Sequence, residues 1–291
     1  MSKVLVTGAQ GLLGSTLVPY LSARGHQVIR LGRSGECDVC ADLTDAGQTA
    51  RALDQAAPEV IVNLAALTNV DECERNPRQA YLANVKAVEN LARWIRERGN
   101  GCHLVQVSTD QVYDGVGPYK EDDVVLTNYY GFSKYAGELA AMLVSSTILR
   151  TNFFGPSQCA SRTSLSDWLV RSLNNGAAIT VFDDVHFSPL SIQRLVESLE
   201  LAVVKRRQGV YNLGSKDGMS KADFAFTLAQ VLNLPTASIR RGTSDNLKLA
   251  AYRPKDMRID ASHFEAAFNV ELPTLKEEIH SMKVAYASKA G

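Results

Sequence analysis

The feature that most constrains this chain is a glycine-rich turn directly after its first apolar run. Val4–Val6 is typical of a short buried strand, and Thr7-Gly8-Ala9-Gln10-Gly11-Leu12-Leu13-Gly14 follows it. Gly8 permits a tight turn, Gly11 lets the backbone approach a pyrophosphate, and Gly14 allows helix and strand to pack closely. Backbone N–H groups at the start of the next helix would then face the phosphates. The pattern predicts a dinucleotide-binding site.

Beyond the turn, short apolar runs alternate with longer amphipathic segments. The further candidate strands are Gln27–Leu31, Val60–Asn63, His103–Val107 and Ser146–Arg150, and the candidate helices are Leu12–Arg24, Thr44–Gln55, Pro77–Arg98 and Tyr129–Leu143. This alternation predicts an α/β fold with a doubly wound parallel sheet, the Rossmann arrangement, and helices on both faces.

After Arg150 the alternation weakens. The remaining candidate helices are Thr163–Asn174, Ile192–Arg206, Lys221–Leu232 and Leu275–Ala287, and the extended segments are Ala178–Phe182 and Val210–Leu213. We expect a dinucleotide-binding domain over residues 1–150 and a smaller, mainly substrate-binding C-terminal lobe over 151–291. Segments within about 183–215 are expected to return to the first domain, with Val210–Leu213 as a further strand of the main sheet.

The residues at the end of the second strand indicate whether NAD(H) or NADP(H) is preferred. An acidic residue about 20 residues beyond the turn would bind the ribose of NAD. Here the segment reads Val28-Ile29-Arg30-Leu31-Gly32-Arg33-Ser34, with no carboxylate. A guanidinium suits a 2′-phosphate, which a carboxylate would repel. Arg33 and Ser34 therefore favour NADP(H), with NAD(H) still open and a solvated loop as the alternative role for Arg33.

A Tyr-x-x-x-Lys pattern, Tyr130-Gly131-Phe132-Ser133-Lys134, lies on a predicted helix. Residues four apart share a helix face, so the phenol of Tyr130 and the ammonium of Lys134 can address one ligand. The tyrosine pKa is ordinarily near ~10, and a nearby cation is expected to lower it. The two side chains form a plausible acid/base unit.

Two neighbouring strand ends add to this pair. The strand His103–Val107 leads into Ser108-Thr109-Asp110, and the preceding strand ends in Asn63-Leu64-Ala65-Ala66. Hydroxyls at the carboxyl ends of parallel strands lie where such sheets bind ligands. Thr109 is therefore predicted to bind a substrate carbonyl oxygen, while the small residues leave room for a coenzyme.

Composition and charge argue against some classes of binding partner. Lys+Arg and Asp+Glu both number 31, so the chain lacks the basic balance typical of nucleic-acid or anionic-membrane binding. We find no apolar stretch long enough for a membrane span and no signal-peptide pattern, so we expect a cytoplasmic protein. The five cysteines, including Cys37-x-x-Cys40, fit free thiols better than a disulfide framework or a zinc site, and no metal site is expected.

At this point the chain resembles the extended short-chain dehydrogenase/reductases, and among them the dTDP-4-dehydrorhamnose reductase group. The resemblance covers nearly the whole chain. Besides the turn, it rests on Asp42-Leu43-Thr44-Asp45, Val62-Asn63-Leu64-Ala65-Ala66-Leu67-Thr68-Asn69-Val70-Asp71, Ser108-Thr109-Asp110-Gln111-Val112-Tyr113, Tyr130-Gly131-Phe132-Ser133-Lys134, Leu149-Arg150-Thr151, Ser188-Pro189 and Arg253-Pro254.

The resemblance implies a role for each matching residue. Thr109, Tyr130 and Lys134 would be the catalytic triad, with a hydride passing from NADPH to a 4-keto carbon. Coenzyme contacts would come from Gly8, Gln10, Gly11, Leu12, Leu13, Gly14, Arg33, Ser34, Asp42, Leu43, Leu64, Ala65, Ala66, Thr68, Asn84, Tyr130 and Lys134. The nucleotide sugar would be bordered by Val70, Thr109, Asp110, Tyr130, Phe153 and Arg253.

Departures from the family pattern fall in the substrate lobe. The family's Arg-Thr-Ser followed by tryptophan becomes Arg150-Thr151-Asn152-Phe153. Gly-Ser-Pro-Thr becomes Phe187-Ser188-Pro189-Leu190, and Arg-Pro-x-x-Ser becomes Arg253-Pro254-Lys255-Asp256-Met257. The chemistry is therefore expected to be retained while the sugar stays open. Simple packing for Phe153 and a surface ion pair for Arg253 are the alternatives.

The leading hypothesis is reduction of a nucleotide-linked 4-keto-6-deoxy sugar. Three alternatives stay open: a redox-neutral nucleotide-sugar epimerase, a non-catalytic NADP-binding regulatory subunit such as some relatives are, and a reductase of a non-sugar carbonyl. A homodimer is a possible assembly for any of them. The complete set of Thr109, Tyr130 and Lys134 favours an enzyme.

Overall fold

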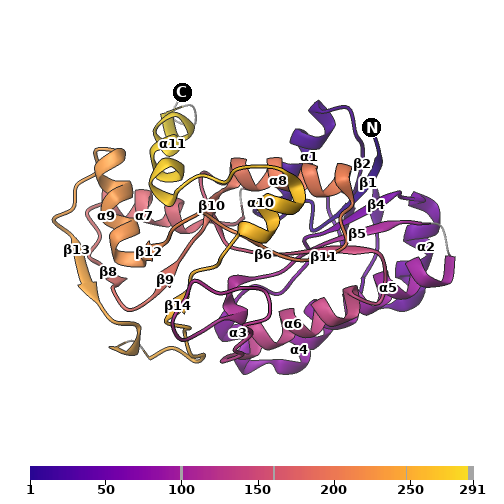
Figure 1. The fold of residues 1–291 in the computed structure, drawn as a ribbon, viewed down its shortest axis with the longest axis horizontal. Coiled ribbons are helices and arrows are strands. Elements are labelled where there is room, and N and C mark those ends of the chain that lie inside the picture. Colours follow the sequence, from indigo (N-terminus) through magenta and orange to yellow (C-terminus); the bar gives the residue numbers. More distant parts are fainter. Residues whose placement is uncertain (99–100, 160, 247, 288–291) are drawn as a thin grey trace.

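Within residues 1–98, 101–159, 161–246 and 248–287, which the computed structural model describes, seven parallel strands form one sheet (Figure 1). In sheet order they are β11 (Gly209–Leu213), β6 (Ser146–Thr151), β5 (His103–Val107), β4 (Val60–Asn63), β1 (Lys3–Thr7), β2 (Gln27–Gly32) and β3 (Val39–Cys40). The strand order reverses between β1 and β4, and ligands of such sheets bind at that point, at the carboxyl ends of the strands. The predicted doubly wound fold is confirmed.

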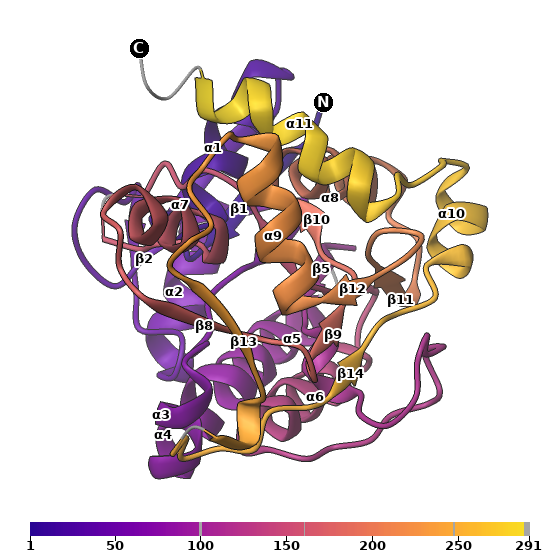
Figure 2. The same cartoon turned by 90° about the vertical axis from the view of Figure 1, so that its left-hand side faces the viewer.

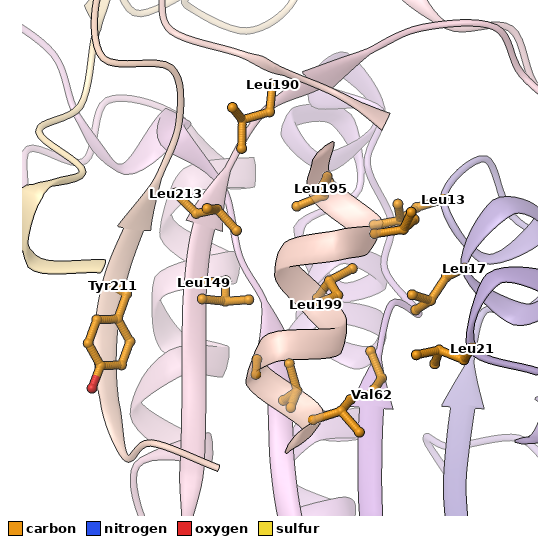
Figure 3. Close-up of a cluster of buried hydrophobic side chains, with 14 of the residues drawn as sticks. Leu13, Leu17, Leu21, Val62, Leu149, Leu190, Leu195, Leu199, Tyr211 and Leu213 are labelled. Carbon is orange, nitrogen blue, oxygen red and sulfur yellow. The ribbon is translucent and has the colours of Figure 1, made fainter. Parts of the chain in front are cut away.

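Helices cover both faces of the sheet. One face carries α1 (Gly14–Ala23), α8 (Ile192–Lys205) and α10 (Ser262–Phe268), and the other carries α2 (Ala46–Ala56), α5 (Ala87–Arg98) and α6 (Tyr129–Ala141). Successive strand residues point to opposite faces, so Val4 and Val6 join the first core and Leu5 the second. Figure 3 shows leucines of α1 and α8 meeting Val62 and Leu149 of the sheet.

A second group of elements forms a lobe at one end of the molecule (Figures 1 and 2). Its helices are α7 (Leu165–Asn174), α9 (Lys221–Val231) and α11 (Leu275–Ala287). Its short strands pair as β8 (Ile179–Phe182) with β13 (Ile239–Gly242), β7 (Phe153–Phe154) with β10 (Leu190–Ser191), and β12 (Met219–Ser220), β9 (His186–Phe187) and β14 (Asp256–Met257) together. Phe224 packs edge-to-face on Phe154 and Phe187, with ring centroids 4.8 and 5.4 Å apart.

Several elements differ from those predicted. The segment Pro77–Arg98 is not one helix but α4 (Pro77–Tyr81), a π-helical turn over Leu82–Lys86 and then α5. Helix α3 (Val70–Arg75) and helix α10 were not predicted, because both are short and their residues become apolar faces only when packed. Single-turn 3₁₀ segments occupy Asp110–Val112 and Ser244–Asn246.

The prediction of free thiols is wrong for one pair of cysteines. Cys37 and Cys40 form a disulfide, with their Cα atoms 6.1 Å apart. The loop after β2 folds back so that β3 can pair beside it, and this brings the two cysteines within bridging range. Cys73, Cys102 and Cys159 are reduced thiols in the described part of the chain.

Candidate functional site

The glycine-rich turn joins β1 to α1 at the carboxyl edge of the sheet. Gly8 has a φ of +62°, which favours glycine, and its backbone packs on Leu64 and Ala65 after β4. Thr7 Oγ1 accepts hydrogen bonds of 3.1 Å from the N–H groups of Leu64 and Ala65. The predicted turn therefore contacts the predicted coenzyme segment after β4, at the point where the strand order reverses.

The N-terminus of α1 fits a phosphate group. Among the described residues no side chain caps this helix at Leu13, whereas Asp45, Asn128 and Ser191 cap α2, α6 and α8. The first N–H groups of a helix have no partner within the helix, and the helix dipole makes this end positive. An uncapped N-terminus beside a glycine turn thus suits the pyrophosphate of a dinucleotide.

Gly14 gives a direct test of this geometry. A Cβ at this position would lie 2.4 Å from the Gly8 carbonyl oxygen and 2.7 Å from Ala9 Cα. We expect Gly14→Ala to force the turn apart and weaken NADPH binding by at least about tenfold, measured by fluorescence titration. The control is Gly47→Ala in α2, where the added methyl meets only side-chain atoms and should leave binding unchanged. Wild-type affinity in Gly14→Ala would contradict the assignment of the turn.

Four predicted coenzyme residues follow β2 and β3 in the chain: Arg33, Ser34, Asp42 and Leu43. Arg33 and Ser34 are exposed in the loop between β2 and β3, and Gly35 of this loop lies against the Gln10 side chain. Asp42 is engaged locally, since its carboxylate accepts hydrogen bonds of 2.9 Å from the backbone and hydroxyl of Thr44. Leu43 is buried under the sheet. Coenzyme contacts for these four residues therefore stay a prediction.

Asn84 holds the segment after β4 in place. Its side chain accepts a 2.8 Å hydrogen bond from Leu67 N–H and donates to the Leu67 carbonyl at 3.0 Å and to Ser133 Oγ at 2.9 Å. Asn84 lies in the π-helical turn, and the close approach of Gly137 to its carbonyl oxygen explains why α6 packs here. The residue thus links the segment containing Ala65, Ala66 and the exposed Thr68 to the helix of Tyr130.

The three predicted catalytic side chains come together. Thr109 lies beside the phenol of Tyr130, and both side chains are buried, with residue exposures of 4% and 8%. Lys134, one turn further along α6, is also buried and donates a 2.7 Å hydrogen bond from Nζ to the Val107 carbonyl. A phenol and a hydroxyl that lie side by side can bind one carbonyl oxygen, and this is the geometry that proton transfer to such an oxygen requires.

The pKa of Tyr130 differs from the expectation that a nearby cation would lower it. The pKa of Tyr130 is raised, not lowered, because burial disfavours the phenolate and the neighbouring Asp110 and Cys73 add negative charge. The Lys134 ammonium is directed at the Val107 carbonyl. Burial also lowers the pKa of Lys134 to about 8. A neutral phenol at pH 7 is the protonated form that an acid requires.

Asp110 lies beside this trio. Burial raises its pKa to about 6, and its carboxylate accepts hydrogen bonds from Asn152 Nδ2 at 2.8 Å and Thr109 Oγ1 at 3.3 Å. Asn152, one of the departures from the family pattern, therefore positions this carboxylate. Sequence reasoning did not assign Asn152 a role.

The other predicted substrate residues, Val70, Arg253 and Phe153, make three different kinds of contact. Val70 packs against the cluster of Cys73, Ala80 and Tyr130. Arg253 forms a 2.8 Å ion pair with Asp71 on α3 and so connects the substrate lobe to the sheet domain. Phe153 is half-buried and packs on the core formed by α1 and α8. Val70 thus lies against Tyr130, whereas Arg253 and Phe153 lie in other contacts.

A buried ion pair behind the trio was missed. Arg150 Nη2 lies 2.7 Å from Glu138 Oε2, and the Ser108 hydroxyl also donates to Glu138. Glu138 follows Lys134 by one turn of α6. Residues four apart share a helix face, so this spacing could have indicated that Glu138 lies on the same buried face as Lys134. The pair supports the start of the segment that contains Thr109.

No group of three or more His, Cys, Asp or Glu side chains among the described residues is arranged to hold a metal ion. None of the helices in that part of the chain is both long and apolar enough to span a membrane.

Comparison of the sequence and the fold with known proteins identifies a family. The sequence model for the RmlD substrate binding domain matches residues 2–287. A dTDP-4-dehydrorhamnose reductase of Streptomyces griseus is 32% identical over 278 residues, covering 90% of this chain and 87% of that protein. Methionine adenosyltransferase 2 subunit beta of Xenopus laevis is 30% identical over 285 residues, with coverages of 90% and 81%. The crystal structure of dTDP-4-dehydrorhamnose reductase from Bacillus anthracis in complex with NADP has the same fold, with a TM-score of 0.86 and 24% identity over 97% of this chain and 98% of that one.

Proposed function

The chain belongs to the RmlD substrate-binding domain family of extended short-chain dehydrogenase/reductases, and from this premise we propose that it is an NADPH-dependent reductase of a nucleotide-linked 4-keto-6-deoxy sugar, acting in deoxysugar or polysaccharide biosynthesis. The observation that carries the proposal is the burial of Thr109, Tyr130 and Lys134 together at the carboxyl edge of the sheet. The relative in Streptomyces griseus, whose name gives the same activity, supports this choice of substrate class.

In the proposed reaction the coenzyme would lie along the turn, α1 and the segment after β4, and it would supply the hydride. Tyr130 would donate its phenolic proton to the sugar's carbonyl oxygen as the carbon receives the hydride. Thr109 would hold the same oxygen and stabilise the charge that develops on it. Lys134, as an ammonium, would favour the phenolate that remains and would contact the coenzyme ribose.

The test of the proposal is a coupled measurement on purified protein. NADPH absorbance is followed with dTDP-4-dehydrorhamnose and with UDP-linked keto sugars as candidates. A reductase consumes NADPH in proportion to product. An epimerase converts the sugar nucleotide with no net change in absorbance, which would replace the proposal.

We propose that NADP(H) is preferred because Arg33 and Ser34 stand where a carboxylate would select NAD. Arg33→Ala is expected to raise KM for NADPH by about ten- to a hundredfold, the loss of one or two charge-assisted hydrogen bonds, while KM for NADH changes less than about twofold. Exposed Arg93 on α5 supplies the control variant Arg93→Ala. Equal changes for both coenzymes would assign Arg33 to the solvated loop instead.

One observation favours a second candidate. The relative in Xenopus laevis is named as a subunit of another enzyme, and it matches this chain over 90% of its length. A subunit role predicts that NADP binds, that no sugar nucleotide is turned over, and that a partner enzyme co-purifies. Turnover that Tyr130→Phe abolishes would exclude it.

A further inference from the structure

Asn128 lies at the start of the helix that carries Tyr130. It is the N-cap of α6, and its side-chain oxygen accepts a 2.8 Å hydrogen bond from the N–H of Gly131. An oxygen acceptor is all that a helix N-terminus requires, so the amide nitrogen of Asn128 is not needed for the cap. Asn128 is 7% exposed, and a donor at such a buried position requires acceptors within the protein.

The amide nitrogen of Asn128 donates to two other segments of the chain. Nδ2 lies 3.1 Å from the Tyr252 carbonyl oxygen and 3.3 Å from Gln111 Oε1. Gln111 belongs to the 3₁₀ turn that follows Thr109, and its backbone N–H donates a 3.2 Å hydrogen bond to Thr109 Oγ1. One amide therefore joins the segment of Thr109, the helix of Tyr130 and the chain that leads into β14 of the substrate lobe.

Close backbone packing makes the first turn of α6 sensitive to this amide. A Cβ at Gly131 would overlap the Gln111 carbonyl oxygen, so this turn packs directly on the 3₁₀ turn. Tyr130 is the second residue of α6, and a shift of the turn would displace its phenol relative to Thr109. A misplacement of about 1 Å is enough to slow a reaction by about a hundredfold.

The lobe segment that Asn128 contacts, residues 250–253, is also bonded to α3. Asp71, in the first turn of α3, accepts hydrogen bonds of 3.0 and 2.9 Å from the two backbone N–H groups that precede Tyr252. It also forms the 2.8 Å ion pair with Arg253. The 250–253 segment thus spans from α3 to the start of α6, with Asp71 at one attachment and Asn128 at the other.

We propose that Asn128 is a positioning residue that ties the 250–253 segment of the substrate lobe to the first turn of α6 and thereby fixes the Tyr130 phenol beside Thr109. The inference rests on the proposed function, because it takes Tyr130 as the proton donor to a sugar carbonyl. It gives the substrate lobe a part in the catalytic geometry as well as in binding.

The first test separates the two ends of this amide. In Asn128→Asp one carboxylate oxygen can still accept from Gly131, but neither oxygen can donate to the two acceptors that Nδ2 contacts. Serine caps helices about as well as asparagine, so Asn128→Ser is the second variant, without an added charge. Both are expected to slow single-turnover oxidation of bound NADPH by dTDP-4-dehydrorhamnose about ten- to a hundredfold, and to change NADPH affinity less than about twofold.

This measurement distinguishes positioning from loss of folded protein. A single-turnover rate constant does not depend on the fraction of the chain that is folded, so partial unfolding would lower only the amplitude. The control is Asp45→Ala, which removes the cap of α2, where Asp45 accepts a 2.8 Å hydrogen bond from the N–H of Gln48. This variant should lower the thermal unfolding midpoint and leave the rate constant unchanged.

Amide hydrogen exchange of the full chain gives a second reading that needs no substrate. Asp71→Ala frees the other attachment of the 250–253 segment. If Asn128 carries the tie, Asp71→Ala should speed exchange in the first turn of α6 about tenfold when Asn128 is present. In the Asn128→Ser background the same change should have little effect on that turn.

Three results would overturn the inference. They are wild-type single-turnover rate constants in both Asn128 variants, a loss of NADPH affinity as large as the loss of rate, and equal acceleration of exchange by Asp71→Ala with and without Asn128. If the wild-type chain oxidises NADPH with none of the candidate sugars, the proposed function is rejected, and the exchange measurement alone decides whether Asn128 ties the lobe to α6.

Discussion

Tyr130→Phe is expected to lower kcat for NADPH-dependent carbonyl reduction by about 100- to 10,000-fold, the usual contribution of a positioned acid. The substitution removes only the phenolic oxygen beside Thr109, and the ring still fills the pocket beside Cys73 and Ala80. NADPH affinity and the thermal unfolding midpoint should therefore stay close to wild type. Steady-state kinetics with a saturating sugar nucleotide supplies the measurement.

A neighbouring tyrosine supplies the control for this variant. Tyr129 precedes Tyr130 on α6 but is 41% exposed, and Tyr129→Phe should leave kcat unchanged. If Tyr130→Phe kept more than about a tenth of wild-type kcat, another group would be the proton donor and the assignment of Tyr130 would fail.

Arg150→Met is expected to lower the free energy of unfolding by about 3–5 kcal/mol, because it leaves the Glu138 carboxylate buried without its cation. The side chains of Arg150 and Glu138 are 2% and 0% exposed, and Arg150 also donates a 2.7 Å hydrogen bond to Tyr113 Oη. Urea unfolding followed by circular dichroism would measure the loss.

Two further variants make this result specific. Arg98 and Asp54 form a 2.6 Å ion pair whose side chains are 47% and 45% exposed, and Arg98→Met should cost less than about 1 kcal/mol. Replacing both buried partners, as Arg150→Met with Glu138→Leu, should recover stability, since no unpaired charge remains. A loss in Arg150→Met as small as that in Arg98→Met would show that water reaches Glu138.

The sheet and its carboxyl edge could be predicted from the sequence because their signals are local. Apolar runs such as Val60–Val62 require burial on both faces, and a glycine turn after such a strand has few structural alternatives. The strand Val210–Leu213 was expected in the main sheet, and β11 lies there beside β6. The proximity of Thr109 and Tyr130 follows from the order of the strands.

Other features depend on tertiary contacts that no local pattern encodes. The π-helical turn at Asn84 arises where α6 packs closely on the segment after β4, and the raised pKa of Tyr130 arises from burial that the Tyr-x-x-x-Lys spacing does not reveal. The Cys37–Cys40 disulfide follows from the pairing of β3 with β2. The catalytic, coenzyme and substrate roles remain predictions for the experiments above.

The central claim is that Tyr130 and Thr109 hold a sugar carbonyl while a hydride reaches its carbon. Turnover of dTDP-4-dehydrorhamnose with NADPH deuterated at the transferred position tests it most directly, with the product analysed by mass spectrometry and NMR. The account predicts a single deuterium on C4 of the sugar for each NADPH oxidised. Conversion of the sugar without deuterium at C4, or oxidation of NADPH with no reduced sugar formed, would contradict it.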